Sequence, residues 1–133
     1  AFTHALHTSL PASDIERTRV EGLNGVDYVD TLEDWSYRQQ QGDVVFDGET
    51  DRIYESGAPL VVATPHSRRS LHGIGSDSTI VWNPGPRKAQ ALSDFPDTAW
   101  KSMLCVETAN ALSDYRVLNE GQSHTLGVLI GRV

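Results

Sequence analysis

The sequence predicts an all-β protein that folds as an antiparallel β-sandwich with at most one or two short helical turns. Short runs of β-favouring residues recur along the chain, and turn residues such as Asn24-Gly25 and Asp47-Gly48 separate them. No heptad pattern, low-complexity segment or internal repeat interrupts this spacing. The 133 residues suit one domain and no linker divides them, so we expect residues 1–133 to form a single domain.

The expected strands follow one another at the near-regular spacing that is typical of sandwiches and barrels. They cover residues 5–10, 17–21, 27–30, 43–47, 52–55, 60–63, 70–74, 79–83, 103–109, 115–118 and 124–130. One helical turn is expected after Pro96, where Asp97 can serve as the N-cap of residues 99–103.

The strand around Cys105 contains an unusual acidic residue. Because side chains alternate between the two faces of a strand, Leu104, Val106 and Thr108 share one face. The opposite face carries Cys105, Glu107 and Ala109. Glu107 is therefore a carboxylate in an otherwise apolar strand, and acids in such positions are uncommon unless they are paired or functional.

The acidic composition limits the kinds of partner. With 11 Lys and Arg against 18 Asp and Glu, the formal net charge is −7, which disfavours a nucleic acid or an anionic membrane as partner. A small anionic ligand is compatible with this charge, because a few arginines can hold one phosphate. No apolar run reaches membrane-spanning length and the single cysteine permits no intrachain disulfide, so we expect a cytoplasmic protein.

Motifs for several other chemistries are absent or incomplete. His4 and His7 are three residues apart and fall on opposite faces of a strand, so we expect no metal site. The segment 73–78, Gly-Ile-Gly-Ser-Asp-Ser, half matches a phosphate-binding glycine-rich loop but precedes a strand, which indicates a hairpin turn. Cys105 lies mid-strand among apolar residues, which disfavours a hydrolase with a cysteine nucleophile.

Three residues remain as candidates for acid–base chemistry: His7, Asp51 and Glu107. Each also has a structural explanation. A strand histidine is commonly exposed or structural, Asp51 can cap a turn, and Glu107 can be a charge on a sheet edge. The residue types alone leave both explanations open.

Six segments together carry a resemblance to a known family. They are residues 5–8 (ALHT), 20–23 (VEGL), 45–54 (VFDGETDRIY), 79–84 (TIVWNP), 88–94 (KAQALSD) and 103–107 (MLCVE). In this order and spacing they resemble the hexose-6-phosphate mutarotases, the glucose-6-phosphate 1-epimerase branch of the aldose 1-epimerase family. The resemblance implies a galactose mutarotase-like supersandwich, of which this chain is the C-terminal half. The chain begins at Ala1 and its only methionine is Met103, so we expect either a trimmed start methionine or a piece of a longer protein.

The resemblance also implies roles for the three candidates. It assigns the general acid to His7, the general base to Glu107 and the binding of sugar hydroxyls to Asp51. Such an enzyme interconverts the α and β anomers of a hexose 6-phosphate by opening the ring to the aldehyde and reclosing it on the other face. The base takes the proton of the C1 hydroxyl while the acid protonates the ring oxygen, and no metal or organic cofactor is implied.

Two further hypotheses stay open. The chain is a non-catalytic carbohydrate-binding β-sandwich if it kept the fold but lost turnover, and the replacement of the family's usual aromatic pair by Ser9-Leu10 favours this. Alternatively, open strand edges pair with a second copy or with a missing N-terminal half. Relatives take a further histidine and their phosphate-gripping arginines from that half, so we expect little or no turnover by the isolated chain.

Four other side chains have undecided roles. Trp82 either lines the pocket or packs in the core. Arg52, Arg68 and Arg69 are possible phosphate contacts, although surface charge is the commoner explanation for such residues.

Overall fold

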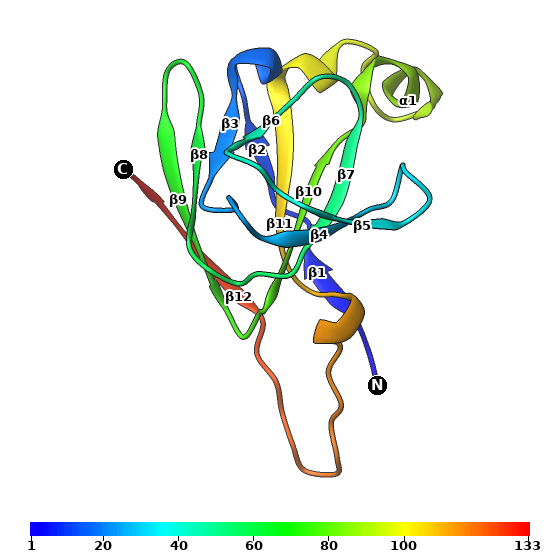
Figure 1. Cartoon of the computed structure of the whole chain (residues 1–133), viewed down its shortest axis with the longest axis vertical. Helices are drawn as coiled ribbons and strands as arrows, with labels where there is room; N and C mark the ends of the chain where they lie inside the picture. Colours follow the sequence, from blue (N-terminus) through cyan, green and yellow to red (C-terminus); the bar gives the residue numbers. More distant parts are fainter.

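A computed structural model, which describes all residues 1–133, shows two antiparallel sheets (Figure 1). The seven-stranded sheet contains β1 (His4–Leu6), β2 (Ser9–Pro11), β4 (Asp27–Asp30), β5 (Ser36–Gln39), β7 (Thr50–Tyr54), β10 (Ser78–Asn83) and β11 (Met103–Asn110). The five-stranded sheet contains β3 (Arg19–Glu21), β6 (Val44–Val45), β8 (Leu60–Ala63), β9 (Arg68–Ile74) and β12 (Gly127–Arg132). The predicted antiparallel β-sandwich is confirmed.

The order of the strands makes β11 a central element of the larger sheet. That order is β1-β11-β10-β7-β4-β5, and β2 continues beside β11 where β1 ends. The smaller sheet has the order β12-β9-β8-β3-β6. Residues from both sheets meet in one apolar core, so each sheet has an inner face toward the core and an outer face away from it.

Strand alternation explains which side chains fill this core. Val81, Leu104 and Val106 face inward from the larger sheet and are almost completely buried. Val62 and Leu71 meet them from the smaller sheet. Full burial of one such side chain contributes roughly 1.5–3 kcal/mol to folding. The core therefore fixes the parity of every strand, including the face on which Glu107 lies.

Helical structure is slightly more extensive than predicted. The expected turn near residues 99–103 is a 3₁₀ helix, Ala99–Ser102, but Thr98 precedes it and no side chain caps it, so the prediction of Asp97 as N-cap is wrong. The sequence prediction missed helix α1 (Gly85–Ala91), whose seven residues are too few to show a clear helical period. Two more 3₁₀ turns cover Ile15–Arg17 and Leu112–Asp114.

Two strand predictions need correction, and one strand was missed. The predicted strand 5–10 is divided into β1 and β2 by a break at residues 7–8. The predicted strand 115–118 is wrong, because its only ladder contact is the isolated bridge between Phe2 and Arg116. This segment belongs to the projecting loop, residues 111–126, which connects β11 to β12 (Figure 1). The edge strand β5 was missed.

The turn at residues 73–78 also differs from the prediction. It joins β9 to β10, and these strands belong to different sheets, so it is a crossover between sheets and no hairpin. Gly75 has a φ of +71°, and a Cβ atom there would lie 2.0 Å from the carbonyl oxygen of Thr125. Only glycine fits this close approach of two backbones.

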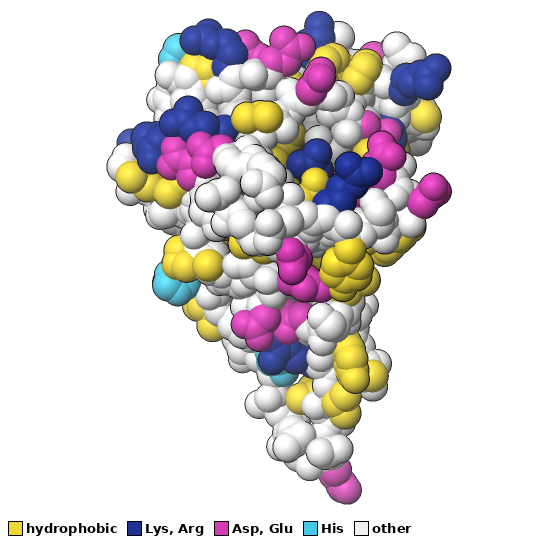
Figure 2. Space-filling view, viewed as in Figure 1, with side chains coloured by type: hydrophobic (Ala, Val, Ile, Leu, Met, Phe, Trp, Pro, Cys, Tyr) yellow, Lys and Arg dark blue, Asp and Glu magenta, His cyan; other side chains and the backbone are white.

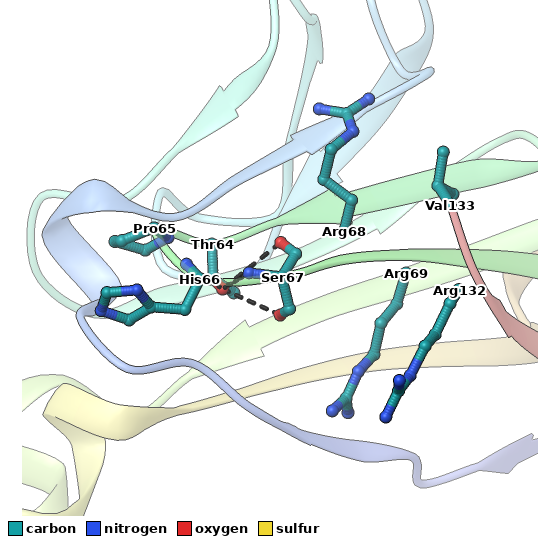
Figure 3. Close-up of a pocket in the computed structure, with 8 residues that line it drawn as sticks. All are labelled: Thr64, Pro65, His66, Ser67, Arg68, Arg69, Arg132 and Val133. Atoms are coloured by element: carbon teal, nitrogen blue, oxygen red, sulfur yellow. Dashed lines mark hydrogen bonds between the residues drawn. The ribbon is translucent and has the colours of Figure 1, made fainter.

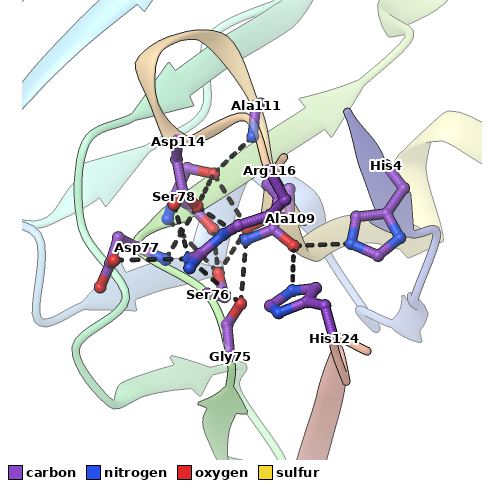
Figure 4. Close-up of polar contacts among 11 residues, drawn as sticks. His4, Gly75, Ser76, Asp77, Ser78, Ala109, Ala111, Asp114, Arg116 and His124 are labelled. Carbon is purple, nitrogen blue, oxygen red and sulfur yellow. Dashed lines mark hydrogen bonds and ion pairs between the residues drawn. The ribbon is translucent and has the colours of Figure 1, made fainter. Parts of the chain in front are cut away.

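A buried polar network fastens the projecting loop to β1 and β11 (Figure 4). Asn110 is fully buried, and its Oδ1 lies 2.6 Å from His4 Nε2 and 2.8 Å from His124 Nε2. Its Nδ2 donates to the Gly75 carbonyl at 2.9 Å and to Asp114 Oδ2 at 3.0 Å. These four bonds hold the end of β11 in place.

None of the helical segments has the length and the hydrophobicity that a membrane-spanning helix needs.

Candidate active site

A break in the first strand places His7 directly across from Glu107. β1 and β2 pair with β11 on either side of residues 7–8, and both pairings keep the same register, in which His7 stands opposite Glu107. Thr8 N–H donates to the Leu6 carbonyl at 2.8 Å, which turns the chain locally and interrupts the ladder. The result is a contact of 3.1 Å between His7 Nε2 and Glu107 Oε1.

The two members of this pair have very different environments. The His7 side chain is 65% exposed, whereas that of Glu107 is only 7% exposed. Loss of water around the Glu107 carboxyl raises its pKa, and the negative charge of Asp51 raises it further, against the opposing effect of His7. Glu107 therefore binds a proton more tightly than an ordinary glutamate, as a general base near neutrality requires.

Asp51 lies on the same outer face of the larger sheet. Trp82 of β10 is the direct partner of both Asp51 in β7 and Cys105 in β11, so these three side chains form a row across three strands. Glu107 is two residues along β11 from Cys105 and shares this face. With strands about 4.8 Å apart, the ends of the row are about 10 Å apart.

Two neighbours position the His7 ring. Cys105 Sγ lies 3.7 Å from its Nδ1, and the Trp82 ring contacts it edge-on, with 5.9 Å between ring centroids and an interplanar angle of 64°. Burial raises the pKa of the Cys105 thiol to about 11, so the thiol stays protonated at neutral pH. It therefore supports His7 and is a poor nucleophile.

His7, Cys105 and Glu107 are also of the types that bind transition metals, and one ligand atom from each lies within 4.8 Å of the others. However, the thiol lies near Nδ1 of His7 and the carboxylate lies near Nε2, on the other side of the ring. Each nitrogen of the His7 ring therefore has its own neighbour in the structure. The observed geometry fits an acid–base pair better than a preformed metal centre.

The structure brings the three predicted site residues onto one face. The explanation of Glu107 as a charge on a sheet edge is wrong, because β11 lies between β1 and β10. The sequence prediction missed Cys105 as a neighbour of His7 and left Trp82 undecided. Strand parity could have found Cys105, since it shares a face with Glu107 two residues away.

The remaining histidine and arginine candidates lie elsewhere. His4 faces away from His7 and bonds Asn110. Arg52 is on the inner face, next to the Tyr28 ring and 3.8 Å from Asp30. Arg68 and Arg69 are in β9 of the smaller sheet. None of the three arginine candidates therefore lies on the face that carries the row.

Comparison with known proteins identifies the family of the chain. The family model described as aldose 1-epimerase matches residues 1–131. The chain belongs to the aldose 1-epimerase family. Proteins of Cenchrus ciliaris and Escherichia coli, both with the name "Putative glucose-6-phosphate 1-epimerase", are 38% and 31% identical to it over 113 and 126 residues. These matches cover 82% and 92% of the chain, but only 34% and 42% of the two relatives.

A solved structure extends the comparison to the fold. The crystal structure of a Salmonella typhimurium protein described as a "putative mutarotase" matches 98% of the chain with a TM-score of 0.78 at 24% identity. The match covers 46% of that protein. The chain thus has the sandwich fold of the mutarotases. It spans less than half the length of the relatives it matches.

The charge of Asp51 gives a testable pH effect. Asp51→Asn removes one of the causes that raise the Glu107 pKa, so that pKa falls. A base works only when deprotonated, and the rise of kcat/KM with pH on the acid side should therefore begin at lower pH in the variant. Initial rates of sugar anomer interconversion, measured across pH with one substrate for both proteins, check this. A profile that shifts to higher pH in the variant would contradict the role of Asp51.

Proposed function

We propose that this chain is the acid–base part of an enzyme that interconverts the α and β anomers of a hexose 6-phosphate. The single observation that carries the proposal is the 3.1 Å contact between His7 Nε2 and the buried Glu107 carboxylate. Family membership and the relatives' printed names support the reaction class and the substrate. The row that ends at Asp51 supports a sugar ring as the bound group.

In the proposed mechanism the sugar binds on the outer face and replaces the direct contact of His7 with Glu107, so that each of these side chains faces one reacting oxygen. Glu107 takes the proton of the C1 hydroxyl, while protonated His7 donates from Nε2 to the ring oxygen, and the bond from C1 to that oxygen breaks. The open aldehyde rotates about its C1–C2 bond. His7 then takes back the proton from the hydroxyl that attacks C1, Glu107 returns its proton to the aldehyde oxygen, and the other anomer leaves.

Asp51 and Trp82 hold the ring during these steps. The carboxylate of Asp51 accepts hydrogen bonds from sugar hydroxyls, and the half-buried indole of Trp82 provides an apolar wall beside them. Positioning of this kind supplies a large share of a catalytic barrier reduction, because the reacting atoms must be aligned with both His7 and Glu107.

The three arginines considered as phosphate contacts do not lie on the outer face of the larger sheet. None of the cavities of the chain is lined by His7, Asp51 or Glu107. We therefore propose that an N-terminal half, of the length that relatives have beyond this match, covers the outer face and supplies phosphate-binding residues. A second copy of the chain is the alternative cover.

Polarimetry of freshly dissolved α-glucose 6-phosphate tests the proposal. The full-length gene product should accelerate the change of optical rotation above the protein-free rate, and α-glucose should respond much less. Residues 1–133 alone should give little or no acceleration. Equal acceleration of both sugars would contradict the phosphate substrate, and strong turnover by residues 1–133 would contradict the need for a second half.

A further inference from the structure

Two arginines stand side by side on the smaller sheet without an acidic partner. Arg69 in β9 and Arg132 in β12 are direct partners in the antiparallel ladder, so their side chains leave the same face of the sheet. Figure 3 shows both guanidinium groups pointing in the same direction. Neither forms an ion pair within 4.0 Å in the structure.

The neighbouring Arg68 shows what a satisfied arginine looks like in this chain. It points to the opposite side of the sheet in Figure 3, where its two terminal nitrogens bind the two oxygens of Glu21 at 3.0 and 2.8 Å. Like charges directly opposite each other in a ladder are destabilising. The chain has a net charge of −7, yet no acidic side chain lines the cavity beside Arg69 and Arg132.

The surface beside the pair is hollowed. An open cavity of about 610 Å³ is lined by eight residues without a single acidic side chain: Thr64, Pro65, His66, Ser67, Arg68, Arg69, Arg132 and Val133. The turn from Thr64 to Ser67 is fixed by its own bonds, including 2.9 Å between the two hydroxyl oxygens. The volume suits a small molecule, and the turn forms a rigid wall for it.

This location is separate from the proposed catalytic row. Arg69 pairs with Val62, a core residue with 2% exposure, and therefore lies on the inner face of the smaller sheet. Glu107 and Asp51 lie on the outer face of the other sheet. A phosphate on the sixth carbon of a sugar held at Glu107 cannot reach through the core to Arg69.

We propose that Arg69 and Arg132 form a second binding site, which takes a phosphate-bearing small molecule distinct from the sugar at Glu107. The planar forks of two guanidinium groups match the oxygens of a phosphate and would remove the repulsion between the two charges. The site does not depend on the proposed mutarotase activity.

A titration with inorganic phosphate at constant ionic strength, followed by ¹H–¹⁵N NMR of the folded chain, tests the site. We expect saturable shifts at the amides of residues 69–71 and 131–132. Arg69→Gln and Arg132→Gln should each weaken binding by roughly 10-fold or more, since each removes a charge-assisted hydrogen bond. Arg87→Gln is the matched control, because Arg87 is exposed on α1 without an ionic partner, and it should bind as the unchanged chain does.

Three outcomes would overturn the proposal. They are shifts that never saturate, shifts centred on residues 105–108 in place of 69–71 and 131–132, and unchanged phosphate affinity in the double variant of Arg69 and Arg132. The amide spectrum of each variant reports whether it is folded. Mutarotase activity plays no part in this readout, so failure of the anion site and failure of the proposed function are distinguishable.

Discussion

Replacing Glu107 by Gln should lower kcat of the full-length gene product by about 10²–10⁴-fold, the range that a positioned general base contributes. Glutamine has nearly the same size but cannot take the proton of the C1 hydroxyl. The fold should be retained, because the raised pKa of Glu107 shows that burial disfavours its charge, and the amide carries none. Initial rates of mutarotation at saturating substrate measure the effect.

The matched control is Glu120→Gln. Glu120 is an exposed carboxylate in the projecting loop and forms no ion pair in the structure, so its removal changes the net charge equally without touching the outer face. Its rate should equal that of the unchanged protein. A Glu107→Gln protein that turns over at the control rate would remove Glu107 from the role of base.

Asn110→Ala should lower the free energy of unfolding by about 2–4 kcal/mol, because the fully buried Asn110 side chain holds the end of β11 in place. The change removes four hydrogen bonds and leaves the Gly75 carbonyl, His4 and His124 without this partner inside the fold. Urea unfolding of both proteins under identical conditions measures the difference.

Asn119→Ala is the control for this second prediction. Asn119 is exposed in the projecting loop, and its side chain makes none of the hydrogen bonds of the structure. Its backbone N–H donates to Gln122 Oε1, and its carbonyl accepts from the Gln122 N–H. Its unfolding curve should overlay that of the unchanged protein. Equal loss of stability in both variants would show that the Asn110 network adds nothing beyond the loop itself.

Strand alternation predicted much of the fold and one part of the site. The strands 27–30 and 60–63 were predicted with their observed bounds, and alternation set Glu107 apart as an acid in an apolar strand. Its contact with His7 could not be predicted from the residues alone. The two are 100 positions apart, and their distance depends on the register between β11 and the first strand.

The missed elements lack the signal that the prediction uses. β5 reads Ser-Tyr-Arg-Gln, is mostly exposed and has no apolar alternation, because it lies at a sheet edge. Residues 115–118 show the opposite error. Tyr115 and Val117 are β-favouring, yet they are 53% and 57% exposed, because no neighbouring strand of this chain accepts the segment. Local propensity describes a residue's preference, while ladder pairing also requires a partner.

Exchange NMR of glucose 6-phosphate at equilibrium tests the proposal that His7 and Glu107 interconvert sugar anomers. Cross-peaks between the two anomeric protons report the exchange rate without any coupled enzyme. A catalytic amount of the full-length gene product should raise this rate well above the protein-free rate, and Glu107→Gln should return it to that level. An exchange rate that stays at the protein-free level with folded, unchanged protein would contradict the claim.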